Sequence, residues 1–308
     1  LINAAPFLQS DHAASRAIGL LLVLVVIAWR SISRRTNQGY REALPEALTQ
    51  RRLEGASLNL DDGDMLEVLR SRLTSARPAE VLYALDLLTE RSSEPVSGLL
   101  APLLDHDQAT VRREALRRIG AGRLVDLTDA VRARLDVELD SETLAATLDA
   151  LAQLEESDAV DVLGVFLDYP EEIVVDAATV GLLRSGGIDG IMAAGDRLLQ
   201  LERSSDDGDR ERAARILGSV GVRGFYRHLL HLLGDPAPAV RCAALTSAAQ
   251  IGNANLWPAV IGNLAHAEYY TTAQRALVSA GAEALPALEE ALSDPKSGLA
   301  FRTRVAET

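Results

Sequence analysis

One pattern of residues occurs twice in this chain, at residues 103–120 and 232–252, and it constrains the fold more than any other feature. Each copy begins with a Leu-Leu pair, passes through a turn that contains Asp, and enters a helix that opens with Val-Arg and later carries Ala-Leu and Ile-Gly. Successive copies are spaced by roughly 30–35 residues, the period of helix pairs that bury their apolar faces only by stacking on one another. Weaker copies lie at residues 144–154, 174–183, 212–217 and 272–281.

The residue types within each copy suit a stacked helix pair. Ala115 and Ala244 allow a close approach between neighbouring helices, and Leu116 lies at helical spacing to fill the shared core. Gly120 and Gly252 are expected to end their helices in the left-handed conformation. Of the residues, 48% are hydrophobic but only 4% are aromatic, so Ala and Leu, which favour helices, dominate. We therefore predict an all-α, right-handed solenoid of about eight helix pairs preceded by one transmembrane helix. The first helices of the pairs are expected to start near Asp64, Val96, Leu124, Ala159, Ile188, Arg223, Asn255 and Glu283.

The two clear copies resemble HEAT repeats, in the short variant also seen in proteins of the phycobilisome-lyase type. The resemblance runs from about residue 60 to the end of the chain. It implies an extended surface that binds a protein partner. No motif for catalysis or for a cofactor stands out in the sequence, so we expect neither. In similar repeats an Arg at the start of the second helix pairs with Asp residues of the turn and forms a polar ladder between repeats; phosphate binding is the alternative role for such an Arg. The ladder residues here would be Arg112, Arg241, Asp105, Asp107 and Asp235.

An apolar run at residues 17–29 predicts a membrane span. Extended to residues 13–29, it reaches the roughly 17 residues that a span requires, provided that Arg16 snorkels to the interface. A signal peptide would have its basic residues before the apolar run, whereas here they follow it. This order predicts that the chain after the span is cytoplasmic, so that the protein lies in the inner (cytoplasmic) membrane with the solenoid in the cytoplasm. The membrane-flanking residues would be Arg30, Arg34, Arg35 and Arg41.

Charge divides the chain into a basic and an acidic part. Residues 1–52 carry seven Arg against three acidic residues, so the remainder is more acidic than the net charge of −13 indicates. We predict a membrane segment at residues 1–30, a basic juxtamembrane linker at 31–59 and the repeat solenoid at 60–308. The acidic balance argues against nucleic-acid binding, which requires a basic surface. The densest basic cluster is interpreted as a solvated face and consists of Arg112, Arg113, Arg117, Arg118 and Arg123.

The front of the chain is similar to bacterial proteins in which a nucleotide-transporter-like membrane domain of the major-facilitator type runs into a HEAT domain. The resemblance covers residues 13–90 and rests on Trp29, on residues 39–44 and on residues 81–88. Because the chain begins with Leu1 rather than Met, it is expected to be a piece of a longer protein. The resemblance implies that the solenoid regulates or assembles an attached transporter.

The sequence contains only weak candidates for metal-binding or catalytic sites. Residues 61–64 and 206–209 are rich in Asp but lack the ligand spacing of a calcium loop, and Asp also caps helices. His228 and His231 share a helix face without a carboxylate at metal-ligand spacing. The single cysteine excludes a cysteine zinc cluster. We therefore expect no enzyme activity and no metal; the alternative functions are a lyase of the phycobilisome type, which would be soluble, and a nucleic-acid-binding solenoid.

Overall fold

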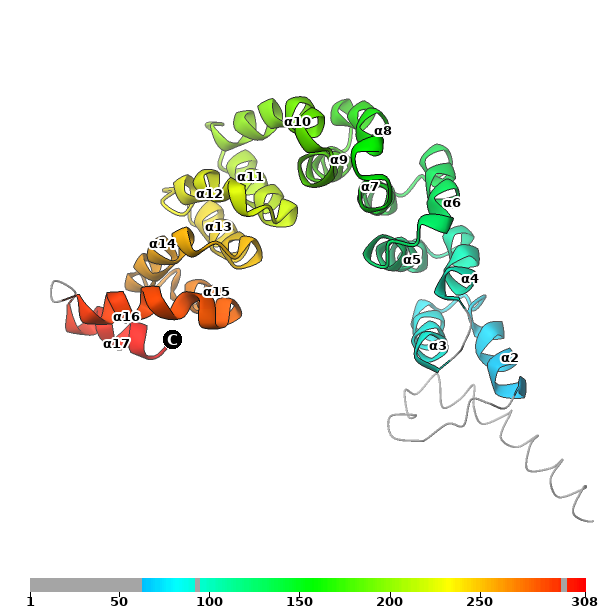
Figure 1. Cartoon of the computed structure of the whole chain (residues 1–308), viewed down its shortest axis with the longest axis horizontal. Helices are drawn as coiled ribbons and strands as arrows, with labels where there is room; N and C mark the ends of the chain where they lie inside the picture. Colours follow the sequence, from blue (N-terminus) through cyan, green and yellow to red (C-terminus); the bar gives the residue numbers. More distant parts are fainter. Residues whose placement is uncertain (1–62, 92–94, 295–297) are drawn as a thin grey trace, which may run out of the picture. The chain divides into compact units, whose positions relative to one another are not determined.

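The computed structural model describes residues 63–91, 95–294 and 298–308, and every regular element within them is a helix (Figure 1). The all-α prediction is confirmed for this part of the chain. The chain divides into two compact units, residues 1–96 and 97–308. Counted over the described residues, the helices form eight pairs. Their first members, with the 3₁₀ turns that lead into them, start at residues 63, 96, 125, 156, 187, 223, 254 and 281, each within three residues of its predicted start.

Unit 1 contributes one described helix pair, α2 (Gly63–Arg72) and α3 (Pro78–Arg91), which contact each other. Pro78 suits the first position of α3, where no backbone N–H is needed. Glu80 in the first turn of α3 accepts hydrogen bonds from Ser75 Oγ at 2.9 Å and from Arg77 Nη1 at 2.9 Å. These bonds fix the turn between the two helices.

Unit 2 contains the remaining pairs, and in five of the seven a short first helix is followed by a longer second helix. The pairs are α4 (Val96–Leu100) with α5 (Ala109–Ala121), α6 (Thr128–Ala133) with α7 (Ser141–Glu155), α8 (Val160–Gly164) with α9 (Glu172–Ser185), α10 (Gly187–Glu202) with α11 (Asp207–Val220), α12 (Tyr226–Leu232) with α13 (Pro238–Ile251), α14 (Trp257–Gly262) with α15 (Tyr270–Ala280), and α16 (Leu285–Ser293) with α17 (Leu299–Ala306). Short 3₁₀ helices extend the first helices at Ala101–Asp105, Val125–Leu127, Arg134–Asp136, Glu156–Ala159, Val165–Asp168, Arg223–Phe225, Ala254–Leu256, Asn263–Ala265 and Gly281–Ala284.

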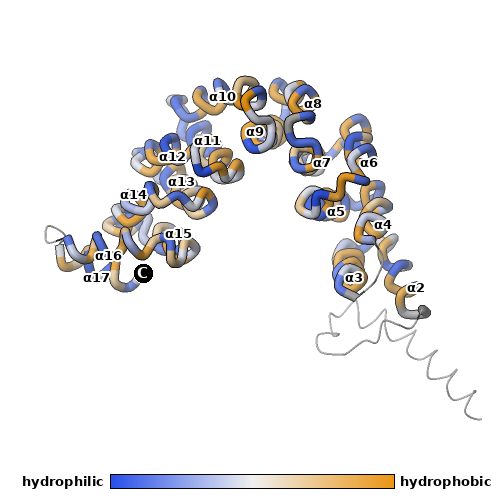
Figure 2. Tube along the Cα trace, in the orientation of Figure 1, coloured by the Kyte–Doolittle hydropathy of each residue, from blue (hydrophilic) through white to orange (hydrophobic). Residues whose placement is uncertain are grey.

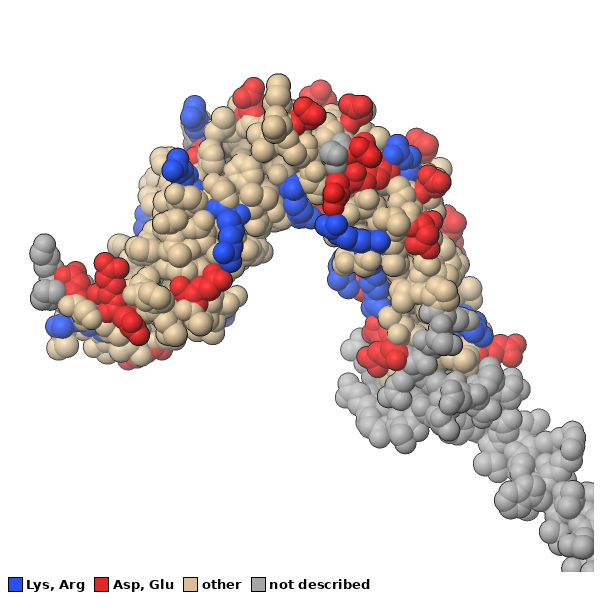
Figure 3. All heavy atoms as spheres, in the orientation of Figure 1, with Lys and Arg blue, Asp and Glu red and all other residues tan. Residues whose placement is uncertain are grey.

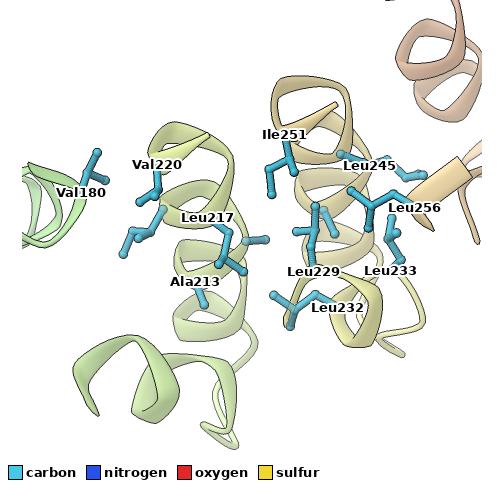
Figure 4. Close-up of a cluster of buried hydrophobic side chains, with 14 of the residues drawn as sticks. Val180, Ala213, Leu217, Val220, Leu229, Leu232, Leu233, Leu245, Ile251 and Leu256 are labelled. Carbon is cyan, nitrogen blue, oxygen red and sulfur yellow. The ribbon is translucent and has the colours of Figure 1, made fainter. Parts of the chain in front are cut away.

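The second helices α5 to α15 pack side by side and form one row, and the first helices form the other row. The core of unit 2 lies between the rows. Figure 4 shows part of it, where Leu217 of α11 points toward Leu229 of α12, and Leu245 of α13 lies beside Leu256. Figure 2 shows hydrophobic and hydrophilic residues mixed along each helix, as amphipathic helices require.

Small residues allow the second helices to approach one another closely. A Cβ atom on Gly120 of α5 would lie 3.1 Å from Ala150 Cα of α7, and one on Gly218 of α11 would lie 2.7 Å from Ser247 Cβ of α13. The prediction that Gly120 ends its helix is therefore wrong: Gly120 is a packing residue inside α5, and the left-handed residue that follows the helix is Arg123, with φ of 48°. Gly252, with φ of 58°, does end α13.

The predicted membrane segment and linker lie outside the described residues, and so do Arg30, Arg34, Arg35 and Arg41. Across the residues that the structure does describe, no helix has the length and apolar character needed to span a membrane.

Candidate functional site

Arg112 joins the first helix pair of unit 2 to the second. It is the fourth residue of α5, and its Nε and Nη2 donate to the two carboxylate oxygens of Glu138 at 2.8 and 2.7 Å. Its Nη1 donates to the carbonyl oxygens of His106 at 2.7 Å and Asp107 at 3.2 Å, in the turn before α5. Arg112 thus binds its own turn and the turn of the next repeat, which is the geometry of a ladder.

Glu138 is the carboxylate of this contact, with its side chain only 1% exposed. Burial alone would raise the pKa of Glu138, but hydrogen bonds from Arg112, from the Asp140 N–H and from Arg134 outweigh it and lower the pKa to about 2. The ion pair is therefore fully charged at neutral pH.

Arg210 repeats this arrangement in α11, also as its fourth residue. It donates to Asp235 Oδ2 at 2.7 Å and Oδ1 at 3.1 Å, and to the Ser204 carbonyl of its own turn at 2.9 Å. Burial would raise the pKa of Asp235, but the bonds from Arg210 and from the Ala237 N–H lower it. Sequence reasoning missed Arg210 because no Val precedes it, although its position from the helix start is the same as that of Arg112.

Arg241, the fourth residue of α13, contacts the next repeat in a different way. It donates to the carbonyls of Asp235 at 2.9 Å and Gly234 at 3.3 Å in its own turn. Its guanidinium lies 4.6 Å from the ring centroid of Tyr269, in the turn before α15. Arg241 thus contacts the next repeat through a cation–π interaction, whereas Arg112 and Arg210 contact it through a carboxylate.

The two remaining predicted ladder residues lie at the turn before α5. Asp107 contributes only its backbone carbonyl to Arg112, and Asp105 accepts a hydrogen bond from Arg134 of the next repeat at 2.9 Å. Helices α7 and α9 have Leu144 and Val175 at their fourth positions, so the ladder has no arginine there.

The basic cluster around α5 is matched by carboxylates. Beyond the contact between Arg112 and Glu138, ion pairs join Arg113 to Glu142, Arg117 and Arg118 to Glu114, and Arg123 to Glu156. Each of the five arginines therefore has an acidic partner, and Arg117 and Arg118 share Glu114.

Of the other candidate sites, residues 61–62 lie outside the described part of the chain, whereas Asp206 and His228 have structural roles. Asp206 caps α11 by accepting a hydrogen bond from the Asp209 N–H at 3.2 Å. His228 Nδ1 lies 2.8 Å from Glu202 Oε2, a carboxylate 26 residues away that the sequence did not reveal as its partner. Within the described residues, no three His, Cys, Asp or Glu side chains are placed to hold a metal ion.

A groove crosses three second helices, α11, α13 and α15, and has a volume of about 870 Å³. Its floor is α13, which presents small side chains such as Ala239, Cys242 and Ala243, and Arg215 of α11 and Arg275 of α15 stand on opposite walls. The complete lining is Glu211, Arg215, Ser219, Ala239, Cys242, Ala243, Thr246, Ser247, Ala249, Gln250, Thr272, Arg275, Ala276 and Ser279.

A smaller groove of about 390 Å³ continues along α7, α9 and α11 and shares Arg215 and Ser219 with the first. Here the charges are paired, because Arg184 donates to Asp149 at 2.8 Å and to the Ser219 carbonyl at 2.6 Å. No motif in the sequence indicated either groove, since their residues come from three successive repeats.

Residues 195–281 match the family of HEAT repeats. The matched segment runs from within α10 to just beyond α15 and contains every residue that lines the larger groove. It supports the prediction of a HEAT-repeat protein and does not reach residues 13–90, which carry the resemblance to transporter-linked proteins. No curated protein matches the sequence.

Three solved structures are similar to the chain at low identity. Human deoxyhypusine hydroxylase in complex with glycerol is 12% identical, with 70% of this chain and 96% of that chain covered and a TM-score of 0.32. An engineered protein is 21% identical, with coverage of 71% and 97% and a TM-score of 0.31. The karyopherin Kap121p bound to the extreme C-terminus of the protein phosphatase Cdc14p is 16% identical, with coverage of 85% and 34% and a TM-score of 0.35. TM-scores this low carry no argument about function.

Proposed function

We propose that this chain is a non-catalytic scaffold that binds a segment of a protein partner in the groove over α11, α13 and α15. The groove itself carries the proposal, because it is larger than the groove along α7, α9 and α11 and lies wholly within the segment that matches HEAT repeats. It is lined by 14 residues, fewer than the roughly 20–30 on each side of a standard interface between globular proteins. A groove of this size suits a single peptide segment.

Close contacts join the three helices that form the groove, which favours binding. Gly218 brings α11 against Ser247 of α13, and Arg241 ties the start of α13 to Tyr269 before α15. A preformed groove loses little conformational entropy when a ligand enters it, so more of the contact energy remains for affinity.

The finer proposal concerns where the scaffold works. We propose that residues 13–29 attach the chain to the inner membrane, that the repeats lie in the cytoplasm, and that the groove regulates or assembles an attached transporter. The apolar run and the arginines that follow it support this proposal.

A groove-filling substitution tests the binding site. Thr246 is an exposed residue of α13, and its hydroxyl bonds only to the Cys242 carbonyl within the same helix, so Thr246→Trp should fill the groove without disturbing the core. Gln200→Trp is the matched control, at an exposed position of α10 outside the groove. The partner captured by the full chain should be retained by the control and weakened at least about tenfold by Thr246→Trp, as for loss of a central contact. Equal capture by both variants would place the binding site elsewhere.

A further inference from the structure

The last three second helices lack acidic residues, although the chain as a whole has a net charge of −13. Helices α13, α15 and α17 contain no Asp or Glu, and their charged residues are arginines. Figure 3 shows basic side chains along the second-helix side in the middle of unit 2, while acidic ones are more frequent along the first-helix side. Among the residues that line the groove, Arg215 and Arg275 are basic and only Glu211 is acidic, so the groove is more basic than the chain as a whole.

Two arginines of the groove are available to a ligand. Arg275 is exposed, and no acidic partner for it occurs among the described residues. The side chain of Arg215 is 62% exposed and has one long contact, 3.5 Å, with Glu211 one turn away on the same helix. Such an exposed pair contributes little energy and can be exchanged for a better partner. Arg241, in contrast, is occupied by the carbonyls of its turn and by Tyr269.

We propose that the groove recognises an acidic peptide segment, with one carboxylate bound by Arg275 and another by Arg215. This inference rests on the proposed function and names the chemistry of the partner. The guanidinium groups match carboxylates in bidentate geometry. The small floor residues, Ala239 and Ala243, let the peptide backbone lie close to α13, where the Gln250 side chain offers a further hydrogen-bond donor.

The helix spacing sets the distance between the two carboxylates. Packed helices lie about 8–10 Å apart, so α11 and α15, on either side of α13, are separated by roughly 16–20 Å. The two arginine side chains line the groove and shorten this span, and an extended peptide rises about 3.3 Å per residue. The bound segment should therefore carry acidic residues about three to five positions apart.

A nucleic acid fits this groove less well than an acidic peptide. A typical nucleic-acid complex neutralises roughly 6–10 phosphates, whereas the groove offers two arginines and places Glu211 beside one of them. Glu211 would repel a continuous row of phosphates. Two carboxylates that are separated along a peptide can each bind one arginine without contacting Glu211.

Selection from a random peptide library displayed on phage, with the full chain immobilised in detergent, tests the proposal. The enriched sequences should contain Asp or Glu about three to five positions apart. A synthetic peptide of the most enriched sequence should bind at least about tenfold more weakly to Arg275→Glu, because the reversed charge repels the carboxylate. Arg203→Glu is the matched control: the same charge change at an exposed residue outside the groove, and it should bind like the unmodified chain.

Cys242 reports the place of binding. It is the only cysteine of the chain and lines the groove, so the bound peptide should slow its reaction with a maleimide several-fold.

Neutral or basic enriched sequences, or equal binding to Arg275→Glu and Arg203→Glu, would overturn the proposal. Tighter binding of a single-stranded oligonucleotide that protects Cys242 would overturn it in favour of nucleic acid. If Thr246→Trp still releases the natural partner in any of these cases, the proposed function stands and only the acidic chemistry is wrong.

Discussion

The ladder shows what single residues reveal before a structure is known. The repeated Val-Arg pair identified Arg112 and Arg241, because an arginine at a fixed place from the helix start faces the same turn in each repeat. The residues that they contact were not predictable. The same role is filled by Glu138 in one turn and by the ring of Tyr269 in another, so no common letter in the sequence marks it.

Removal of Arg112 should cost more stability than removal of Arg241. Arg112→Leu leaves Glu138 buried without its bidentate partner and should lower the free energy of unfolding by about 3 kcal/mol. Arg241→Leu loses bonds to carbonyls and the contact with Tyr269, and should cost about 1–2 kcal/mol. Urea unfolding followed by circular dichroism measures both, and hydrogen exchange should place the first loss in α5 and α7. Equal losses would contradict the assignment of Glu138 as the critical partner.

The pH dependence of the free energy of unfolding tests whether Arg112 acts through Glu138. The pKa of Glu138 is lowered from 4.5 to about 2, so its contribution to stability is complete above pH 4.5 and is lost as the pH falls through about 2. The stability difference between the unmodified chain and Arg112→Leu should stay constant from neutral pH to about 5 and narrow below it. A difference that persists unchanged at low pH would show that Arg112 acts through another group.

At the scale of helices, periodicity predicted the pairs and their starts, but it did not predict how closely the helices approach. The Ile-Gly motif suggested a helix end at both of its copies. In α13 Gly252 does end the helix, whereas in α5 Gly120 is an internal residue that touches Ala150 of α7. A glycine in one sequence does not indicate which of these roles it has, because the difference depends on the neighbouring helix.

Two glycine-to-alanine substitutions separate helix propensity from packing. Gly195→Ala in α10 has open space, since only a side-chain methyl of Ile191 lies near, at 3.8 Å. It should stabilise the chain by roughly 0.5–1 kcal/mol through helix propensity. Gly218→Ala in α11 places a methyl group 2.7 Å from Ser247 Cβ and should destabilise by about 1–3 kcal/mol through overpacking. Thermal melting measures both, and stabilisation by Gly218→Ala would show that α11 and α13 separate easily.

Across the described residues, the sequence was sufficient to predict the repeat architecture but not the groove that we propose as the binding site. Repeats are visible because each helix pair must solve the same packing problem, so their apolar residues recur. The groove has no such recurrence: Arg215, Cys242 and Arg275 come from three different repeats and meet only when the helices stack. The charge pattern did carry some information, since α13 and α15 lack acidic residues. It indicates a basic groove only once the two helices are known to be neighbours.

Deletion of residues 13–29 tests the proposed membrane attachment of the whole chain. The full chain should remain in the membrane pellet after alkaline carbonate extraction, and the deletion variant should become extractable, because an apolar run of this length supplies the affinity for the bilayer. The arginines after the run predict that protease digests the repeats in inverted inner-membrane vesicles and spares them in intact spheroplasts. Binding of the selected peptide should be unchanged by the deletion, since the groove residues all lie between 211 and 279. Release of the full chain by carbonate would refute the anchor, and digestion in spheroplasts would reverse its orientation.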